Sequence, residues 1–233
     1  MADKLERAGE PSFIRVLGRR ARDSPSAILL FAQIIAVLAY PLAGNTGVGR
    51  IMLGVFGVVV LAIAVYAVRA TPALTWVAVL LGIPVVVLTV LDGVYPRNDT
   101  VGLVSAVMHA LFYAYTAYGL VRYLFEDMWV TRDEIYAVGA NFTVVSWMFA
   151  YVYMAVQIIW PGSFVAYQGE GQRTFLELLY LSFANLTSVG LSDVTAVLPF
   201  ARSFVIIEQV AGVMYVALII ARVVGLTIHR WRS

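Results

Sequence analysis

The sequence predicts an all-α membrane protein with six transmembrane helices, and three observations lead to that fold class. Hydrophobic residues make up 61% of the 233 residues and charged residues only 13%, whereas about a quarter of a typical soluble domain is charged. The charged residues gather at the ends and in short connections. Between them lie apolar stretches close to the roughly 20 residues that a helix needs to cross a bilayer. A disordered chain, a basic nucleic-acid-binding protein and an ordinary globular enzyme all fit this composition poorly, and the lipid bilayer is the expected surrounding.

Six apolar stretches qualify as membrane spans, because each is long and carries few or no internal charges. The sixth contains one acidic residue, Glu208, and one interior basic residue, Arg222. The six predicted spans are Pro25–Leu42, Ile51–Val68, Ala73–Leu91, Val101–Phe125, Tyr136–Trp160 and Ala201–Ile228.

A shorter apolar run lies between the fifth and sixth spans. Phe175–Val189 has only 15 residues, which is too short to span the bilayer and too apolar for a solvated loop. We therefore expect a re-entrant segment, in which a helix enters the membrane and the chain returns to the same side.

The basic residues predict the orientation of the spans, because cytoplasmic loops are enriched in Lys and Arg. With a cytoplasmic N-terminus and six spans, most basic residues fall on the inner side. Both termini are then cytoplasmic, the re-entrant segment enters from outside, and the plasma (inner) membrane is the expected location. The outer side holds only Arg50, Arg97, Arg173 and Arg202.

Charge and span length divide the chain into four parts. Residues 1–24 form a cytoplasmic leader, either an interfacial helix on the inner leaflet or a solvated basic segment. Residues 25–125 hold four spans, residues 126–135 form a charged cytoplasmic linker, and residues 136–233 hold the last two spans with the re-entrant segment.

Several functional classes lack the residues that they need. The chain has no cysteine, which excludes disulfides and thiolate metal sites. His109 and His229 fall at different depths, so no Ser-His-Asp set converges, and no metal-ligand spacing or nucleotide-binding glycine loop is present. We expect no enzymatic activity and no cofactor. A secondary transporter ranks last, because it would need broken helices in both halves.

The most informative residues lie in the last part of the chain. Its order is a span, a connecting segment, a short helix, the sequence TSVGLSD at residues 187–193, and a final span. This order and spacing resemble the pore module of the tetrameric potassium-channel superfamily, whose selectivity filter usually reads TTVGYGD. The resemblance covers about Tyr136–Leu226.

The resemblance implies a homotetramer in which four chains surround one ion path. Each chain contributes an extended strand whose carbonyl groups replace the hydration shell of the ion. Ser188 would supply the innermost ring of hydroxyl groups, and Asp193 a ring of carboxylates at the outer mouth that concentrates cations. Gly190 suits a backbone conformation that only glycine enters cheaply. K⁺ (or Na⁺) would be bound at Thr187, Ser188, Val189 and Gly190, with Leu191 completing the path.

Two residues depart from the family pattern, both in the outer half of the filter. Leu191 stands where the family has an aromatic residue, usually a tyrosine whose hydroxyl helps to tether the filter. Ser192 stands where the second glycine usually lies. If that position needs a left-handed backbone, a serine costs about 1–2 kcal/mol per chain; otherwise the outer filter adopts another shape.

Other residues would support the filter. Thr174 and Glu177 have the spacing of a capping box at the start of the short helix. We therefore favour a helix-capping role for Glu177 over direct contact with ions. Tyr180 is a further support residue. Glu208 needs a partner if it is buried, and it either braces the filter or contacts ions.

The final span would line the inner part of the pore. Gly212 lies where the family often has a hinge glycine, and close helix packing is the alternative role. Helical phase relative to the resemblance predicts that the cavity and gate are lined by Val213, Val216, Ile220 and Val224.

The front half does not contain a voltage sensor. A sensing span carries 3–4 gating charges, but Val101–Phe125 holds only His109 and, near one end, Arg122. His109 titrates near physiological pH when unperturbed, yet a histidine hydrogen-bonded between helices is the commoner case.

We therefore expect a channel subunit that conducts K⁺ passively. A non-selective Na⁺/K⁺ pore and a non-conducting scaffold or regulatory subunit with the pore fold are the alternatives.

Overall fold

The computed structural model describes residues 24–43, 56, 57, 60, 72–95, 98–126, 131–167, 169 and 171–232. The expected leader therefore lies outside the described residues except for its last residue. The second predicted span also lies outside them, apart from Phe56, Gly57 and Val60.

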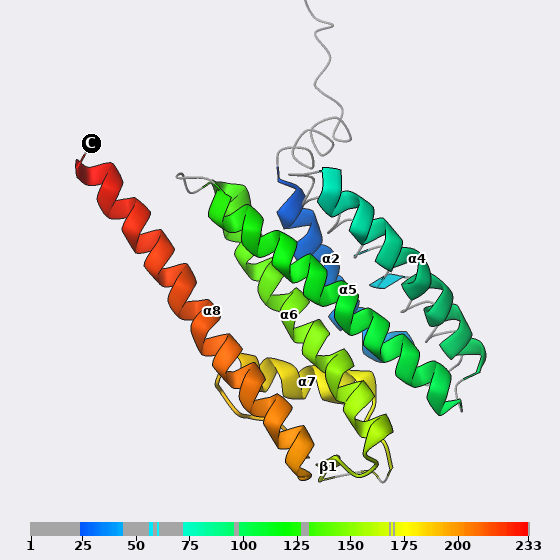
Figure 1. Ribbon diagram of the computed structural model, residues 1–233. Coiled ribbons are helices and arrows are strands. Elements are labelled where there is room, and N and C mark those ends of the chain that lie inside the picture. Colours follow the sequence, from blue (N-terminus) through cyan, green and yellow to red (C-terminus); the bar gives the residue numbers. More distant parts are fainter. Residues whose placement is uncertain are drawn as a thin grey trace, which may run out of the picture.

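The described part of the chain is mostly helical (Figure 1). Three of its helices are long and apolar enough to cross a membrane, over Asp99–Phe125, Asp133–Ile159 and Pro199–Arg222. The elements are α2 (Pro25–Ala39), η1 (Tyr40–Ala43), α4 (Pro72–Val94), α5 (Asp99–Glu126), α6 (Arg132–Ile159), β1 (Phe164–Ala166), α7 (Phe175–Leu186), β2 (Val194–Ala196) and α8 (Pro199–Arg232).

The helices form a bundle with one long helix at its side. Helix α6 packs against α2 and α5, and α4 covers α5. Helix α8 contacts the rest mainly near one end, where the short α7 lies across α6 and α8 (Figure 1). The run predicted to be re-entrant therefore forms a 12-residue helix held between two long helices.

The connection between α5 and α6 is shorter than the expected linker of residues 126–135. Helix α5 continues to Glu126 and α6 already begins at Arg132. Thr131 caps α6, because its hydroxyl accepts a hydrogen bond from the backbone N–H of Glu134 at 3.2 Å. Asp133 and Glu134 lie in the first turn, where carboxylates interact favourably with the helix dipole.

Asp133 joins three helices at this end of the bundle. Its carboxylate accepts hydrogen bonds from the backbone N–H of Ser26 at 3.0 Å, the Ser26 hydroxyl at 2.8 Å and the Tyr123 hydroxyl at 2.9 Å. Ser26 lies in the first turn of α2, whose N–H groups lack helical partners. One buried carboxylate of α6 therefore fixes the start of α2 and the last turns of α5.

The main apolar core lies between α2, α4, α5 and α6 and extends to α7. Aromatic rings make this connection: Trp147 of α6 contacts Tyr113 of α5 and Phe175 at the start of α7, with ring centroids 5.7 and 6.2 Å apart. The position of α7 therefore depends on packing with the front half of the chain.

A two-stranded sheet closes the segment that contains α7. Strand β1 precedes α7 and strand β2 follows residues 187–193, and the two pair antiparallel with Val165 opposite Thr195. The chain leaves α6 and enters α8 next to this sheet, so both ends of the segment are tied at one place.

We predict that Asp133→Ala lowers the free energy of unfolding by about 1–3 kcal/mol, because it removes the acceptor of the buried Ser26 hydroxyl and backbone N–H and breaks the hydrogen bond to Tyr123 of α5. Thermal unfolding of the purified protein in detergent measures the effect. Asp99→Ala is the control, since Asp99 is exposed at the start of α5. Equal unfolding midpoints for the two variants would contradict the role given to Asp133.

Candidate functional site

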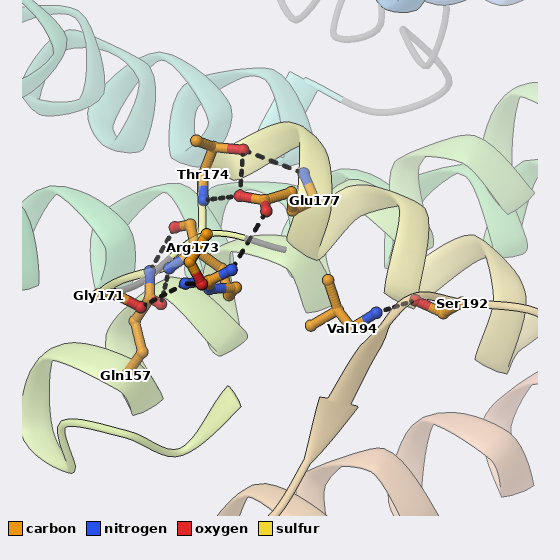
Figure 2. A network of polar contacts seen from close by, with 8 residues as sticks. Gln157, Gly171, Arg173, Thr174, Glu177, Ser192 and Val194 are labelled. Carbon is orange, nitrogen blue, oxygen red and sulfur yellow. Dashed lines mark hydrogen bonds and ion pairs between the residues drawn. The ribbon is translucent and has the colours of Figure 1, made fainter. Parts of the chain in front are cut away.

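Helix α7 begins with the predicted capping box. The Thr174 hydroxyl accepts a hydrogen bond from the Glu177 backbone N–H at 3.3 Å, and the Glu177 carboxylate accepts one from the Thr174 backbone N–H at 2.6 Å (Figure 2). The reciprocal pair satisfies two N–H groups at the helix start. Glu177 is thus occupied as a helix cap.

Arg173 and Gln157 hold the start of α7 against the end of α6 (Figure 2). The Gln157 amide accepts a hydrogen bond from the Arg173 backbone N–H at 2.8 Å and donates one to the Arg173 carbonyl at 2.9 Å. The Arg173 guanidinium donates to the carbonyls of Gly169 and Gly171 at 3.0 and 2.8 Å, and lies 3.5 Å from Glu177. Sequence reasoning missed this pair, although a glutamine in the last turn of an apolar span was a usable signal.

The C-terminal end of α7 leads directly into residues 187–193. The N–H of Ser188 donates to the Asn185 carbonyl and the N–H of Gly190 to the Ala184 carbonyl, both at 2.9 Å. The Thr187 hydroxyl donates to the Phe183 carbonyl at 2.7 Å. The chain therefore turns sharply at the helix end, where the helix dipole is negative.

The left-handed backbone lies at Ser188 and Gly190, with φ of 59° and 70°. Ser188 takes the position after the helix cap, where a left-handed residue, usually glycine, ends many helices. A serine there costs about 1–2 kcal/mol. The positive φ of Gly190 is a conformation that only glycine enters cheaply, as expected for this position from the sequence.

Ser192 does not have the left-handed backbone considered for it. Among the described residues that are not glycine, positive φ occurs at Ser188 alone. The Ser192 hydroxyl instead accepts a hydrogen bond from the Val194 N–H at 3.1 Å (Figure 2). This local bond turns the chain into β2. Of the two possibilities considered for Ser192, a strained left-handed serine or a different shape of the outer segment, the structure has the second.

Residues 187–193 face away from the rest of the chain. All of them are exposed except the half-buried Ser192, and Leu191 has an exposed fraction of 71%. Tyr180 of α7 is also exposed, at 51%, so its own chain covers only part of Leu191 and Tyr180. The exposed residues of the segment carry backbone carbonyl groups, hydroxyl groups and the Asp193 carboxylate.

Gly212 lets α8 approach the end of α7 closely. A Cβ atom at Gly212 would lie 2.2 Å from the Leu186 carbonyl oxygen, a distance that no side chain can occupy. Gly212 therefore has the close-packing role; a hinge at this position stays a prediction.

Glu208 is fully buried between three helices. Its carboxyl group forms hydrogen bonds with the hydroxyls of Tyr153 on α6 and Ser182 on α7. Glu208 thus braces the back of α7, one of the two roles expected for it. Sequence reasoning did not find Tyr153 and Ser182, because they lie 55 and 26 residues away in the chain.

Helix α8 contacts its own chain along one narrow face. Ala201, Glu208 and Gly212 are buried on this face, at the spacing of helical turns. The predicted cavity-lining residues lie elsewhere on α8 and are between 46% and 57% exposed: Val213, Val216, Ile220 and Val224.

Arg222 ties the far end of α8 to the start of α6. Its guanidinium lies 3.2 Å from the Glu134 carboxylate and 5.2 Å from the ring centroid of Phe125 at the end of α5. Both members of the ion pair are largely buried, so the end of α8 beside Ile220 and Val224 is held against the front half.

His109 packs between helices. Its Nδ1 lies 2.8 Å from the Ser105 carbonyl, its Nε2 lies 3.2 Å from the Thr89 hydroxyl, and its ring stacks on Tyr151. This favours the packing role over a sensing role.

We predict that Gly212→Ala destabilises the fold by about 1–3 kcal/mol or more, because the new methyl group forces α8 away from α7. Thermal unfolding in detergent measures the loss. Gly225→Ala is the matched control on the same helix, since its Cβ meets nothing within 4 Å. A Gly212→Ala midpoint as high as that of the control would show that α8 is not seated on Leu186.

We predict that Arg222→Glu destabilises the fold by placing two carboxylates together, and that adding Glu134→Arg restores part of the loss. The coupling energy from this double-mutant cycle should be about 0.5–3 kcal/mol, measured by thermal unfolding of the four proteins. Additive effects would mean that the two side chains do not interact.

Residues 110–228 match the family model described as "Ion channel", which covers slightly more than half of the chain. No curated protein and no solved structure matches. The matched residues contain α6, α7, residues 187–193 and most of α8, the elements that form the site described above. The chain is an integral membrane protein that belongs to the ion channel family.

Proposed function

We propose that four copies of this chain form a cation channel whose ion path is lined by residues 187–193. The observation that carries the proposal is the exposure of this segment at the C-terminal end of α7, a short helix clamped between two long apolar helices. A segment of this kind is costly in a membrane unless it lines a hydrated path.

The charges around the segment favour cations. The carbonyl end of α7 carries a partial negative charge, and the exposed carboxylate of Asp193 adds a full one. Thr187, Ser188 and Val189 are exposed, and their carbonyl oxygens can replace water around an ion that has lost its hydration shell. An anion would meet repulsion at each of these groups.

The exposed surface of α8 supports assembly. The helix is apolar on nearly every side, yet its own chain covers one face only. Copies arranged around one axis would bring residues 187–193 together and give one exposed face of α8 to a shared cavity and the others to lipid or neighbouring copies. In this arrangement Val213, Val216, Ile220 and Val224 line the cavity and the gate.

K⁺ is the proposed main ion, and a non-selective Na⁺/K⁺ pore is the second candidate. The second candidate is favoured by the outer half of the segment, where Leu191 is exposed and Ser192 closes a local turn. Leu191 has no hydroxyl group for the hydrogen bond that a tyrosine would form, and Ser192 does not have the positive φ expected of a glycine at its position. The outer ion positions are therefore less constrained than the inner ones.

Flux through liposomes that contain the purified protein tests conduction. Vesicles loaded with K⁺ should release it down its gradient, and barium, a divalent ion of similar size, should block the release. Repeating the assay with Na⁺ and larger cations ranks the permeabilities. No flux from protein shown by native mass spectrometry to be a tetramer would favour a non-conducting role.

We predict that the double substitution Leu191→Tyr with Ser192→Gly raises the K⁺-to-Na⁺ permeability ratio, because it restores a hydroxyl tether and a residue free to adopt positive φ. The ratio comes from the same flux assay. Val165→Tyr is the control, since Val165 is exposed on β1 outside the proposed path. An unchanged ratio in the double variant would rule out the outer filter as the determinant of selectivity.

A further inference from the structure

The buried cluster behind α7 contains one carboxyl group and several neutral hydrogen-bonding groups. Glu208 Oε2 lies within hydrogen-bond distance of the Tyr153 hydroxyl, and Oε1 within hydrogen-bond distance of the Ser182 hydroxyl. The Ser182 hydroxyl also lies 2.8 Å from the backbone carbonyl of Ser146. Glu208 and Ser182 are fully buried, so water does not complete their hydrogen bonds.

The number of hydrogens in this cluster constrains its protonation. A serine hydroxyl has one hydrogen to donate, but Ser182 lies close to two acceptors, Glu208 Oε1 and the Ser146 carbonyl. If Glu208 were a carboxylate, Ser182 would have to choose between them. A proton on Oε1 resolves the conflict: Oε1–H donates to Ser182, Ser182 donates to Ser146, and Tyr153 donates to Oε2.

The lack of an ion-pair partner for Glu208 among the described residues agrees with this count. In the described part of the chain the ion pairs join Arg173 to Glu177 and Arg222 to Glu134, and Glu208 is in neither. The groups that face it from α6 and α7 are the Tyr153 hydroxyl, the Ser182 hydroxyl and the neutral amide of Asn185. An unpaired carboxylate in such a place is costly to bury, whereas a hydrogen-bonded neutral acid is not.

We propose that Glu208 is held as a neutral carboxylic acid at neutral pH and that its proton completes a chain of hydrogen bonds from Tyr153 through Ser182 to Ser146. Glu208 is thus a positioning residue. It joins α6, α7 and α8 one turn of α8 before Gly212, and it keeps the end of α7 in place without a counter-ion.

Infrared difference spectroscopy on the purified full-length protein tests the protonation state at neutral pH. The spectrum of the wild type minus that of Glu208→Gln should contain the C=O stretching band of a protonated carboxyl group. Tyr153→Phe should move this band to higher frequency, because Oε2 loses its donor. Glu177→Gln is the matched control and should remove carboxylate bands only. Carboxylate bands alone in the Glu208→Gln difference would overturn the proposal.

Stability gives a second measurement with a conservative rescue. In Glu208→Gln the amide nitrogen can donate to Ser182 and the amide oxygen can accept from Tyr153, so the unfolding midpoint should stay near that of the wild type. Glu208→Leu leaves both hydroxyls without their partner and should lower the midpoint by about 2–4 °C or more. Equal losses for the two variants would also overturn the proposal, whereas Tyr153→Phe keeps the spectroscopic test available if Glu208→Leu does not fold.

Ion flux gives a third measurement, which rests on the proposed function. Glu208→Gln should keep the order of cation permeabilities, and Glu208→Leu should lose flux together with stability. A change in this order in Glu208→Gln would mean that the position carries a charge that ions sense, and would count against a neutral acid. Absence of flux in the wild type would reject conduction and would leave the infrared and stability results standing.

Discussion

The close contact between Gly212 of α8 and the Leu186 carbonyl of α7 is the constraint on which the positions of α7 and residues 187–193 depend. Because no side chain separates the two backbones, the end of α7 has a definite position along α8. Glu208, one turn earlier on the same face, then meets Ser182 and Tyr153. Residues 187–193 begin where this contact ends, and they extend away from their own chain.

The start of α7 is held by Arg173, Gln157 and the capping box, and its end is held by Gly212 and Glu208 of α8. Arg173, Gln157 and the Thr174–Glu177 capping box form hydrogen bonds within the chain, and these bonds keep the helix direction constant. At the other end, residues 188–191 and Asp193 are exposed. A rigid support that ends in exposed, oxygen-bearing residues suits the stabilisation of a partly dehydrated cation.

The front half of the chain contacts the last part of the chain at two places along α6. Near α7, the aromatic contacts of Trp147 link the core of the bundle to Phe175. At the other end of α6, Asp133 holds α2 and α5 while Glu134 holds Arg222 of α8. In the described part of the front half Arg122 is the one arginine, and the bundle contacts both α7 and the far end of α8. The end of α8 is therefore held by α5 and α6 at Arg222.

The sequence by itself determined the membrane class, a short apolar helix before residue 187 and the capping box of that helix, because apolar length and a four-residue motif are local properties. It also pointed to Gly190 and to Glu208 as a residue that needs partners. The tertiary structure decided which partners: Tyr153 and Ser182 come from other helices, as do Leu186 for Gly212 and Gln157 for Arg173. It also placed the left-handed residue at Ser188 and not at Ser192. The backbone of Ser188 follows from its place directly after the end of α7, and that of Ser192 from the hydrogen bond between its hydroxyl and the Val194 N–H.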